Sequence, residues 1–231
     1  MTDHPVLQGL YPFLHGHKHG PDAMNLALLE SVRQKVVHHH DVVAAFFAEH
    51  SRAVVAAAHA IAGVYRRGGR LYTMGNGGSS CDAAHLAVEF LHPVTTGRPA
   101  LTAVDLTANA TMMSAVANDV GFGHVFVRQI TAQGRAGDGL VGLSTSGNSE
   151  NLVKAFVKAK ELGLVTIALS GKTGGQLTGL GLDHCLIVST DSIHRIQECH
   201  VVIYHLLWDL VHTLLADDRA DLQGGSAKGT P

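Results

Sequence analysis

Residues 70–91 read RLYTMGNGGSSCDAAHLAVEFL, and this stretch decides the fold. A short apolar run at 70–75 ends in glycines, and the apolar residues of 79–91 then recur at the spacing of a helix. A strand that turns through glycines into a helix is the repeating unit of a parallel α/β sheet. The glycines let the backbone approach a ligand, and the first turn of the helix offers free N–H groups to an anion. We therefore predict a βα unit with an anion-binding bend.

The bend does not match the common nucleotide motifs. It lacks the third glycine of the dinucleotide-binding pattern and the lysine of a P-loop. The net charge of -2, without a basic stripe or a block of lysine and arginine, also gives no basis for binding nucleic acid or an anionic membrane. Any anionic ligand must therefore be held locally.

The alternation of short apolar runs and helical segments continues downstream. The predicted strands are Arg70–Gly75, Ala100–Val104, Gly139–Ser144, Val165–Ser170 and Cys185–Val188. The predicted helices are Ser79–Leu91, Ala108–Asn118, His124–Ala132, Ser149–Leu162 and Ile193–Leu215. Upstream, Asp22–Glu49 and Ser51–Arg67 are predicted to form two helices, with Ser51 as the N-cap of the second. The expected fold is α/β: a three-layer sandwich in which helices flank a five-stranded parallel sheet, with an N-terminal helical pair and a long C-terminal helix.

We expect one domain over residues 22–215, because no linker interrupts the chain of 231 residues. Residues 1–21, rich in proline, glycine and histidine, are expected to form an irregular arm. Residues 216–231 are expected to form a disordered tail.

The three cysteines indicate a reducing compartment. Cys81, Cys185 and Cys199 are an odd number and have no C-x-x-C spacing, so neither a disulfide framework nor a structural zinc site is expected. The N-terminus has no cationic start followed by an apolar run, and no stretch reaches the roughly 18 apolar residues of a membrane span. The expected location is the cytoplasm, without a membrane.

A second bend has similar chemistry. Residues 144–149 read STSGNS, between a predicted strand and a predicted helix. Four hydroxyl groups beside a glycine, at a helix start, can surround phosphate oxygens with neutral donors. An ordinary serine N-cap and turn would explain any one of these serines equally well. Two such bends at the carboxyl ends of strands, where open α/β sheets bind ligands, favour a phosphate site.

Four groups of residues together resemble the phosphoheptose isomerases of the SIS (sugar isomerase) family. They are GNGGS at 75–79 with CDA at 81–83, STSGNS at 144–149, ND at 118–119 with GF at 121–122, and RIQE at 195–198. The likeness extends from about residue 30 to residue 215. It implies the SIS fold, a sugar-phosphate substrate, and a homotetramer with its sites at subunit interfaces.

The resemblance also implies a set of substrate-binding residues. They are Asn76, Gly77, Gly78, Ser79, Asn118, Asp119, Ser144, Thr145, Ser146, Ser149 and Gln197. Asp119 could orient the hydroxyls of an open-chain sugar, and it is equally well explained as a turn residue.

His85 and Glu89 are four residues apart, so their side chains lie on one face of the predicted helix. Such a pair is often only a solvated surface contact. The resemblance gives these positions a role, with His85 as a metal ligand and Glu89 as an acid/base. It likewise assigns Gln197 and His205 as a metal ligand and an acid/base.

The implied metal set is His85, Glu89, Gln197 and His205, whose nitrogen and oxygen atoms would suit Zn²⁺ or another divalent ion. Its geometry is difficult, because eight residues of regular helix span about 12 Å. One ion does not easily reach both Gln197 and His205 from an undistorted helix. Either the glutamine reaches along the helix, or the site draws residues from more than one subunit.

The implied reaction interconverts sedoheptulose 7-phosphate and D-glycero-D-manno-heptose 7-phosphate through an enediol. It needs a base for the C–H proton and an acid near the carbonyl oxygen. Glu89 is the expected base and His205 the expected acid.

The chain departs from the family pattern at two places. His194 stands where the family usually has an aspartate before the RIQ run, and residues 90–98 differ from the usual charged stretch. These departures favour an alternative, a non-catalytic SIS protein that senses a sugar phosphate or binds the replication initiator DnaA. The histidine clusters at 15–19 and 38–40 could bind transition metals, but three consecutive histidines on a helix point in three directions and do not chelate one ion well, so both clusters are expected to be surface features.

Overall fold

The computed structural model describes residues 21–224, with side chains as far as Ala216 except those of Pro21 and Ala23. The predicted arm therefore lies almost wholly outside the described residues. Contacts divide the chain into one unit that ends at His40 and a second that begins at Asp41, and the two are considered separately. The sheet and all the candidate site residues belong to the second unit.

The predicted N-terminal helical pair is wrong, because helix α2 runs without a break from Pro21 to Arg66. Ser51 does not cap a second helix. Its hydroxyl instead donates a hydrogen bond to the carbonyl of Phe47, one turn earlier in the same helix. A serine in mid-helix can satisfy its hydroxyl in this way, so it does not require a helix start.

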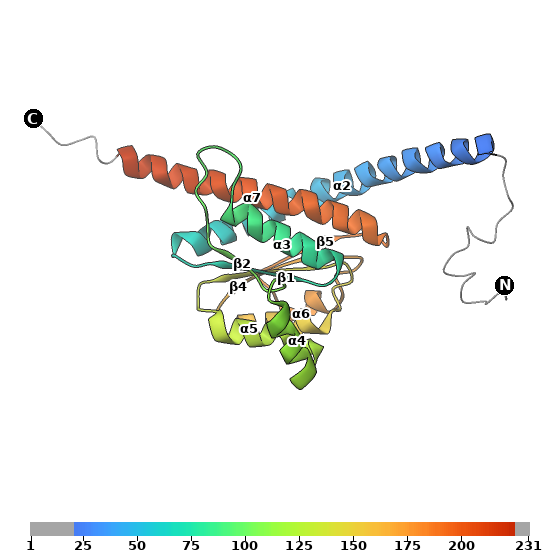
Figure 1. The fold of residues 1–231 in the computed structure, drawn as a ribbon. Helices are drawn as coiled ribbons and strands as arrows, with labels where there is room; N and C mark the ends of the chain where they lie inside the picture. Colours follow the sequence, from blue (N-terminus) through green and yellow to red (C-terminus); the bar gives the residue numbers. More distant parts are fainter. Residues whose placement is uncertain (1–20, 225–231) are drawn as a thin grey trace, which may run out of the picture. The chain divides into compact units, whose positions relative to one another are not determined.

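The predicted five-stranded parallel sheet is confirmed, with the order β2-β1-β3-β4-β5 (Figure 1). The strands are β1 (Leu71–Gly75), β2 (Ala103–Asp105), β3 (Gly139–Ser144), β4 (Val165–Gly171) and β5 (His184–Val188). Strand β2 begins three residues later than predicted. Because β1 and β3 are neighbours and Gly75 pairs with Leu143, the two bends that follow these strands start side by side.

Helices cover both faces of the sheet, which confirms the three layers. One layer holds α3 (Gly78–Leu91), α7 (Ile193–Gly224) and the part of α2 that follows His40, and the other holds α4 (Ala110–Asp119), α5 (Val125–Gln133) and α6 (Glu150–Glu161) (Figure 1). Short 3-10 helices lie at Phe122–His124 and Gly175–Leu180.

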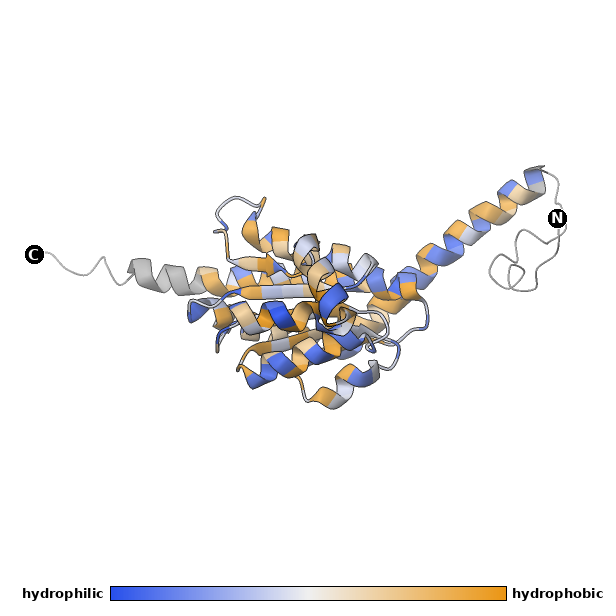
Figure 2. Cartoon of the chain, turned by 60° about the horizontal axis from the view of Figure 1, so that its bottom comes forward, coloured by the Kyte–Doolittle hydropathy of each residue, from blue (hydrophilic) through white to orange (hydrophobic). Residues whose placement is uncertain are grey.

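Alternate strand residues supply the two hydrophobic cores. Leu71 of β1 packs in the core with α3 and α7, whereas its neighbour Tyr72 packs in the core with α5 and α6. This is the two-residue period of a strand that is buried on both faces. Figure 2 shows hydrophobic and hydrophilic residues interleaved along the covering helices, as amphipathic layers require.

Helix α7 continues to Gly224, so the predicted tail is helical over residues 216–224, and its remainder lies outside the described residues. Contrary to the sequence estimate, the segment Ile193–Ala216 is long and apolar enough to span a membrane, with a mean hydropathy of 1.4. Its apolar character has a structural explanation, because one stripe of the helix lies in the core. The stripe consists of Ile196, Cys199, Ile203, Tyr204, Leu207, Trp208 and Val211.

Candidate functional site

The two predicted bends meet at the carboxyl edge of the sheet. They enclose a cavity of about 140 Å³ lined by Asn76, Ser79, Leu143, Ser144, Thr145, Ser146 and Ser149. Six of these residues are in the predicted substrate-binding set, so the structure brings the hydroxyls of one loop beside the glycine bend of the other. We call this cavity the hydroxyl cradle. Gly77 and Gly78 belong to the same bend and are exposed.

A close backbone approach shapes the cradle. Gly147 has φ +66°, and a β-carbon at this position would lie 1.9 Å from the carbonyl oxygen of Gly174. Only glycine fits such a contact at positive φ. The N–H of Gly147 donates to Ser144 Oγ at 3.1 Å, and this hydroxyl lies 3.3 Å from Ser149 Oγ. The hydroxyls of the loop are therefore held close together without a cationic side chain.

Both helix starts beside the cradle are free of side-chain caps. Gly77 precedes α3 and Ser149 precedes α6, and neither makes a side-chain capping hydrogen bond. The first N–H groups of a helix carry its positive dipole end and need partners. An anion in the cradle would meet two such ends, which is the usual arrangement for phosphate.

Asn151 supports the glycine bend of the cradle, and the sequence analysis missed it. Its side-chain amide and that of Asn76 each donate to the other's oxygen at 2.9 Å. Asn151 is only 2% exposed, so this reciprocal pair is its way of satisfying buried polar atoms. The pair ties the glycine bend to the first turn of α6. An asparagine placed just after a hydroxyl loop was the available signal.

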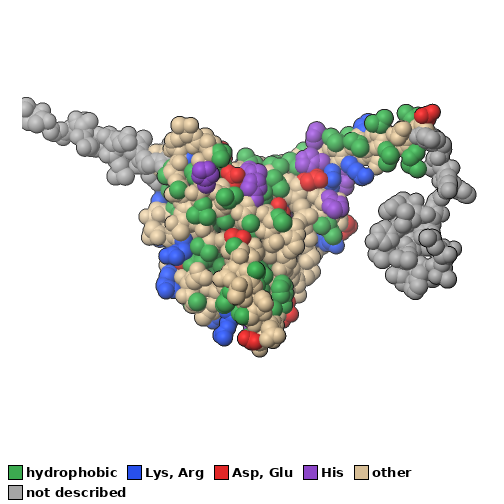
Figure 3. Space-filling model, viewed as in Figure 1, with side chains coloured by type: hydrophobic (Ala, Val, Ile, Leu, Met, Phe, Trp, Pro, Cys, Tyr) green, Lys and Arg blue, Asp and Glu red, His purple; other side chains and the backbone are tan. Residues whose placement is uncertain are grey.

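A second group of side chains lies between α3 and α7. The ligand atoms of His85, Glu89 and His205 all lie within 4.8 Å of one another, and we call these residues the acid/base cluster. His85 Nε2 is 3.1 Å from Glu89 Oε1, and the side chains of His85 and Glu89 are 43% and 19% exposed. The histidine and glutamate are therefore more than a solvated surface pair, because α7 adds a third group. Figure 3 shows histidine and acidic side chains gathered on the face over these two helices.

The cluster continues into the core through Tyr204. Its hydroxyl lies 2.7 Å from His85 Nδ1, and its ring is 1% exposed. Burial raises the pKa of Tyr204 above its usual range, and the charges of Asp82 and Glu89 raise it further. Burial likewise raises the pKa of Asp82, partly offset by His85. The tyrosine hydroxyl therefore stays protonated at neutral pH.

Helices α3 and α7 lie side by side and run in the same direction (Figure 1). Gln197 packs at the start of α3, since a β-carbon at Gly78 would lie 2.3 Å from its Nε2. Further along, Trp208 Nε1 donates to the carbonyl of Glu89 at 2.8 Å. The structure therefore groups three of the four expected metal ligands and places the fourth, Gln197, near the cradle end of α3.

The segment at 90–98, which departs from the family pattern, is fastened to α7. Arg98 forms an ion pair with Asp209, and its guanidinium lies 4.3 Å from the centre of the Trp208 ring. A guanidinium over an indole adds a cation–π attraction to the ion pair. Since Trp208 also holds the backbone of Glu89, this segment braces the acid/base cluster from outside.

Asn118 and Asp119 lie elsewhere, at the end of α4. Both are exposed, and Asn118 Nδ2 donates to Asp119 Oδ1 at 2.8 Å. Neither residue lines the cradle or belongs to the acid/base cluster. Their role in orienting a sugar stays a prediction.

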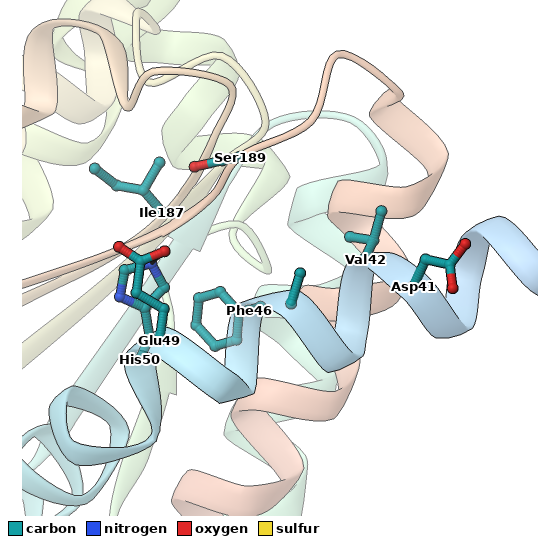
Figure 4. A pocket seen from close by; sticks show the side chains of 8 residues that line it. Asp41, Val42, Phe46, Glu49, His50, Ile187 and Ser189 are labelled. Carbon is teal, nitrogen blue, oxygen red and sulfur yellow. Dashed lines mark ion pairs between the residues drawn. The ribbon is translucent and has the colours of Figure 1, made fainter.

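A further cavity of about 210 Å³ lies between α2 and the end of the edge strand β5. Phe46, Glu49 and His50 from α2 face Ile187 and Ser189 across it (Figure 4). It contains neither a hydroxyl-rich loop nor a helix start. The cradle, though smaller, has the chemistry of an anion site.

The donor set of the acid/base cluster fits a divalent cation. Two imidazole nitrogens and one carboxylate oxygen are the ligands of many zinc sites in which a fourth position stays open. The contact of His85 Nδ1 with Tyr204 is the outer hydrogen bond that metal-binding histidines usually make.

Comparison with known proteins agrees with this architecture. The family model described as the SIS domain matches residues 37–171. The chain therefore belongs to the SIS domain family.

The individual relatives are more specific. The phosphoheptose isomerase of Chlorobium phaeobacteroides is 46% identical over 167 residues, covering 71% of this chain and 74% of the relative. That of a Geobacter species is 40% identical over 184 residues, covering 80% of this chain and 95% of the relative.

Two solved structures share both sequence and fold with the chain. The phosphoheptose isomerase of Neisseria gonorrhoeae has a TM-score of 0.76 at 35% identity and covers 80% of this chain and 99% of its own. The phosphoheptose isomerase of Francisella tularensis has a TM-score of 0.77 at 32% identity, and the match covers 80% of this chain and 98% of that structure's chain.

Proposed function

We propose that the protein is an aldose–ketose isomerase that converts sedoheptulose 7-phosphate into D-glycero-D-manno-heptose 7-phosphate through an enediol. The observation that carries the proposal is the presence, in one unit, of a neutral anion cradle and a separate His/Glu/His cluster. The names of the relatives support the substrate class. The cradle would hold the phosphate, and the cluster would move the proton.

Phosphate recognition would rely on hydroxyls and backbone N–H groups. Ser144, Ser146 and Ser149 line the cradle together with Thr145, and two uncapped helix starts face the same edge. Neutral donors at helix starts bind phosphate without a buried lysine or arginine. The site would therefore select the phosphate group and leave the sugar hydroxyls to other residues, among them Gln197, Asn118 and Asp119.

Proton transfer would be the task of Glu89 and His205. Glu89 would take the proton from the carbon beside the carbonyl group and return it to the adjacent carbon. His205 would give a proton to the carbonyl oxygen and then take the proton of the neighbouring hydroxyl, so that the aldehyde forms. Each such positioned acid or base contributes about 10²–10⁴ to the rate.

The resident ion would be Zn²⁺ or another divalent cation, held by His85, Glu89 and His205, with Gln197 as the fourth ligand that the family resemblance implies. When bound, such an ion polarises a carbonyl oxygen as a Lewis acid. His85 would serve only to hold the ion, since its other nitrogen is occupied by Tyr204.

We further propose a cytoplasmic homotetramer with composite sites. From Ser79 to Glu89, helix α3 advances about 15 Å, so the cradle and the cluster of one chain are far apart for one small substrate. Sites shared between subunits would relieve this mismatch. Residues 24–37 of the first unit also expose a series of apolar side chains that a second copy could cover. They are Met24, Leu26, Leu28, Leu29, Val32, Val36 and Val37.

The alternative is a non-catalytic SIS protein that senses a sugar phosphate or binds DnaA. His194, in the place of the family aspartate, favours it. Both the isomerase and the sensing protein require phosphate binding, but only the isomerase requires turnover.

The deciding experiment is incubation of the purified protein with sedoheptulose 7-phosphate, with and without added zinc, followed by product analysis. We expect the aldose to form and zinc to accelerate its formation. Binding of the sugar phosphate without any aldose in either condition would favour the sensing protein and contradict the isomerase.

A further inference from the structure

Tyr204 connects the acid/base cluster to the hydrophobic core. It precedes His205 on α7, and since successive helical residues are about 100° apart, the two side chains point in different directions. Tyr204 is 1% exposed and lies in the core between α3, α7 and the sheet. Its ring centre is 5.5 Å from that of His85 and 4.8 Å from that of His205.

The presence of a hydroxyl on Tyr204 requires an explanation, because the surrounding core is apolar. Phenylalanine would fill the same volume without burying an oxygen. A buried hydroxyl without a partner destabilises the folded protein, so buried tyrosines normally have one. Here the partner is His85 Nδ1, at 2.7 Å. The oxygen is therefore placed against one nitrogen of one cluster residue.

The two ring nitrogens of His85 are thereby given different surroundings. Nδ1 faces the hydroxyl of Tyr204, while Nε2 is 3.1 Å from Glu89 Oε1. A half-turn of the ring about its Cβ–Cγ bond would put carbon atoms in place of both nitrogens and leave the buried hydroxyl without its partner. The ring is thus fixed both in its orientation and in which nitrogen it presents.

We propose that Tyr204 is a positioning residue for His85, which holds Nδ1 so that Nε2 is the nitrogen presented to a divalent cation between Glu89 and His205. This inference rests on the proposed function, because it concerns the same metal. Tyr204 acts through His85 and does not itself touch the substrate.

A tyrosine hydroxyl suits this role because it can either donate or accept a hydrogen bond. It can donate to an unprotonated Nδ1, or accept from a protonated Nδ1 when Nε2 has its lone pair free for a cation. In the second case the hydroxyl hydrogen needs an acceptor. Asp82, one turn before His85, has a buried carboxylate oxygen, Oδ2, that makes no hydrogen bond with Tyr204 or with another described residue, so it would have to move to accept this hydrogen. Its charge already acts on the Tyr204 hydroxyl.

The test is the zinc affinity of metal-stripped Tyr204→Phe, measured by competition with a chromogenic chelator. This change removes one oxygen and keeps the ring. The matched control is Tyr72→Phe, which removes an equally buried hydroxyl from the opposite core, away from the acid/base cluster. Loss of an outer-sphere partner typically weakens metal binding by about 10- to 100-fold, which we expect for Tyr204→Phe alone.

A second measurement uses the unaltered protein. Nitrogen-15 NMR of the zinc-loaded wild type should show His85 bound through Nε2 and protonated at Nδ1. Coordination through Nδ1 would overturn the inference even if Tyr204→Phe folded poorly.

The remaining outcomes separate the inference from the function on which it rests. Wild type that binds zinc and turns over, together with normal zinc affinity in Tyr204→Phe, would overturn the inference alone. Wild type that binds no zinc at this cluster would overturn both the inference and the metal in the proposed function.

Discussion

The hydroxyl cradle and the acid/base cluster are built in opposite ways. The cradle consists of backbone and small polar side chains from two loops that follow adjacent strands. The cluster consists of long side chains from α3 and α7, which are more than a hundred residues apart in the chain. Rigid local geometry makes the first, and tertiary packing of two helices makes the second. The two should therefore fail independently when mutated.

The largest effect should come from Glu89→Gln. The amide keeps the shape of the side chain and cannot accept a proton, so kcat should fall by about 10²–10⁴. The measurement is turnover of sedoheptulose 7-phosphate, with inorganic phosphate binding as the control. Phosphate binding should be unchanged, because the cradle does not contain Glu89. Turnover near the wild-type rate would remove Glu89 from the chemistry.

Gly147→Ala should impair the cradle and leave the acid/base cluster intact. A β-carbon here would lie 1.9 Å from Gly174 O, at a φ of +66°, so the loop must shift. We expect phosphate affinity to fall by about 100-fold or more and stability by about 1–3 kcal/mol. Zinc affinity, measured by chelator competition, should stay at the wild-type value. A parallel loss of zinc affinity in the folded variant would show that the two regions are coupled.

These two regions also differ in how far they could be predicted from sequence. The cradle follows from local patterns: the GNGGS and STSGNS bends each end a buried strand, and β3 has the predicted bounds. The contacts of the cluster with Tyr204 and Trp208 could not be predicted, because no local pattern sets the register of α3 against α7. The same is true of the contact between Asn151 and Asn76, which are 75 residues apart, although the asparagine just after the hydroxyl loop was visible in the sequence. The prediction of two N-terminal helices was wrong because a serine such as Ser51 fits both an N-cap and a helix interior.

His200 of α7 is connected to the cradle through Ser170 and should make stability depend on pH. It is buried on α7, and its Nε2 donates to the carbonyl of Ser170, whose hydroxyl donates to the carbonyl of Ser144. Burial lowers the pKa of His200 to about 4, with the hydrogen bond to Ser170 opposing. The unfolded chain takes up this proton near pH 6.5, so the stabilisation is present above pH 6.5 and is lost as pH falls towards 4.

Protonation of His200 in the unfolded chain should lower the free energy of unfolding by up to about 3 kcal/mol as pH falls. Urea unfolding between pH 7 and pH 4.5 should show a shallower loss of stability in His200→Gln, whose amide can still donate to Ser170, than in the wild type. Parallel curves for the two proteins would mean that His200 is not the group responsible.

The smallest effect is expected for Asn151→Ala. It leaves Asn76 without its reciprocal partner and should weaken phosphate binding by about tenfold, the size of a hydrogen-bond loss. Isothermal titration with inorganic phosphate measures this, and Asn148→Ala, at an exposed position of the same loop, is the comparison. If Asn148→Ala weakened binding more than Asn151→Ala, the amide pair would not be what orders the bend.

The most direct measurement follows sedoheptulose 7-phosphate by proton NMR in deuterium oxide with the zinc-loaded protein. If the cradle holds the phosphate while Glu89 moves a proton through an enediol, the aldose will form, and it will carry deuterium at its second carbon to the extent that the Glu89 carboxyl exchanges its proton with solvent before returning it. Bound ketose that yields no aldose would contradict the account.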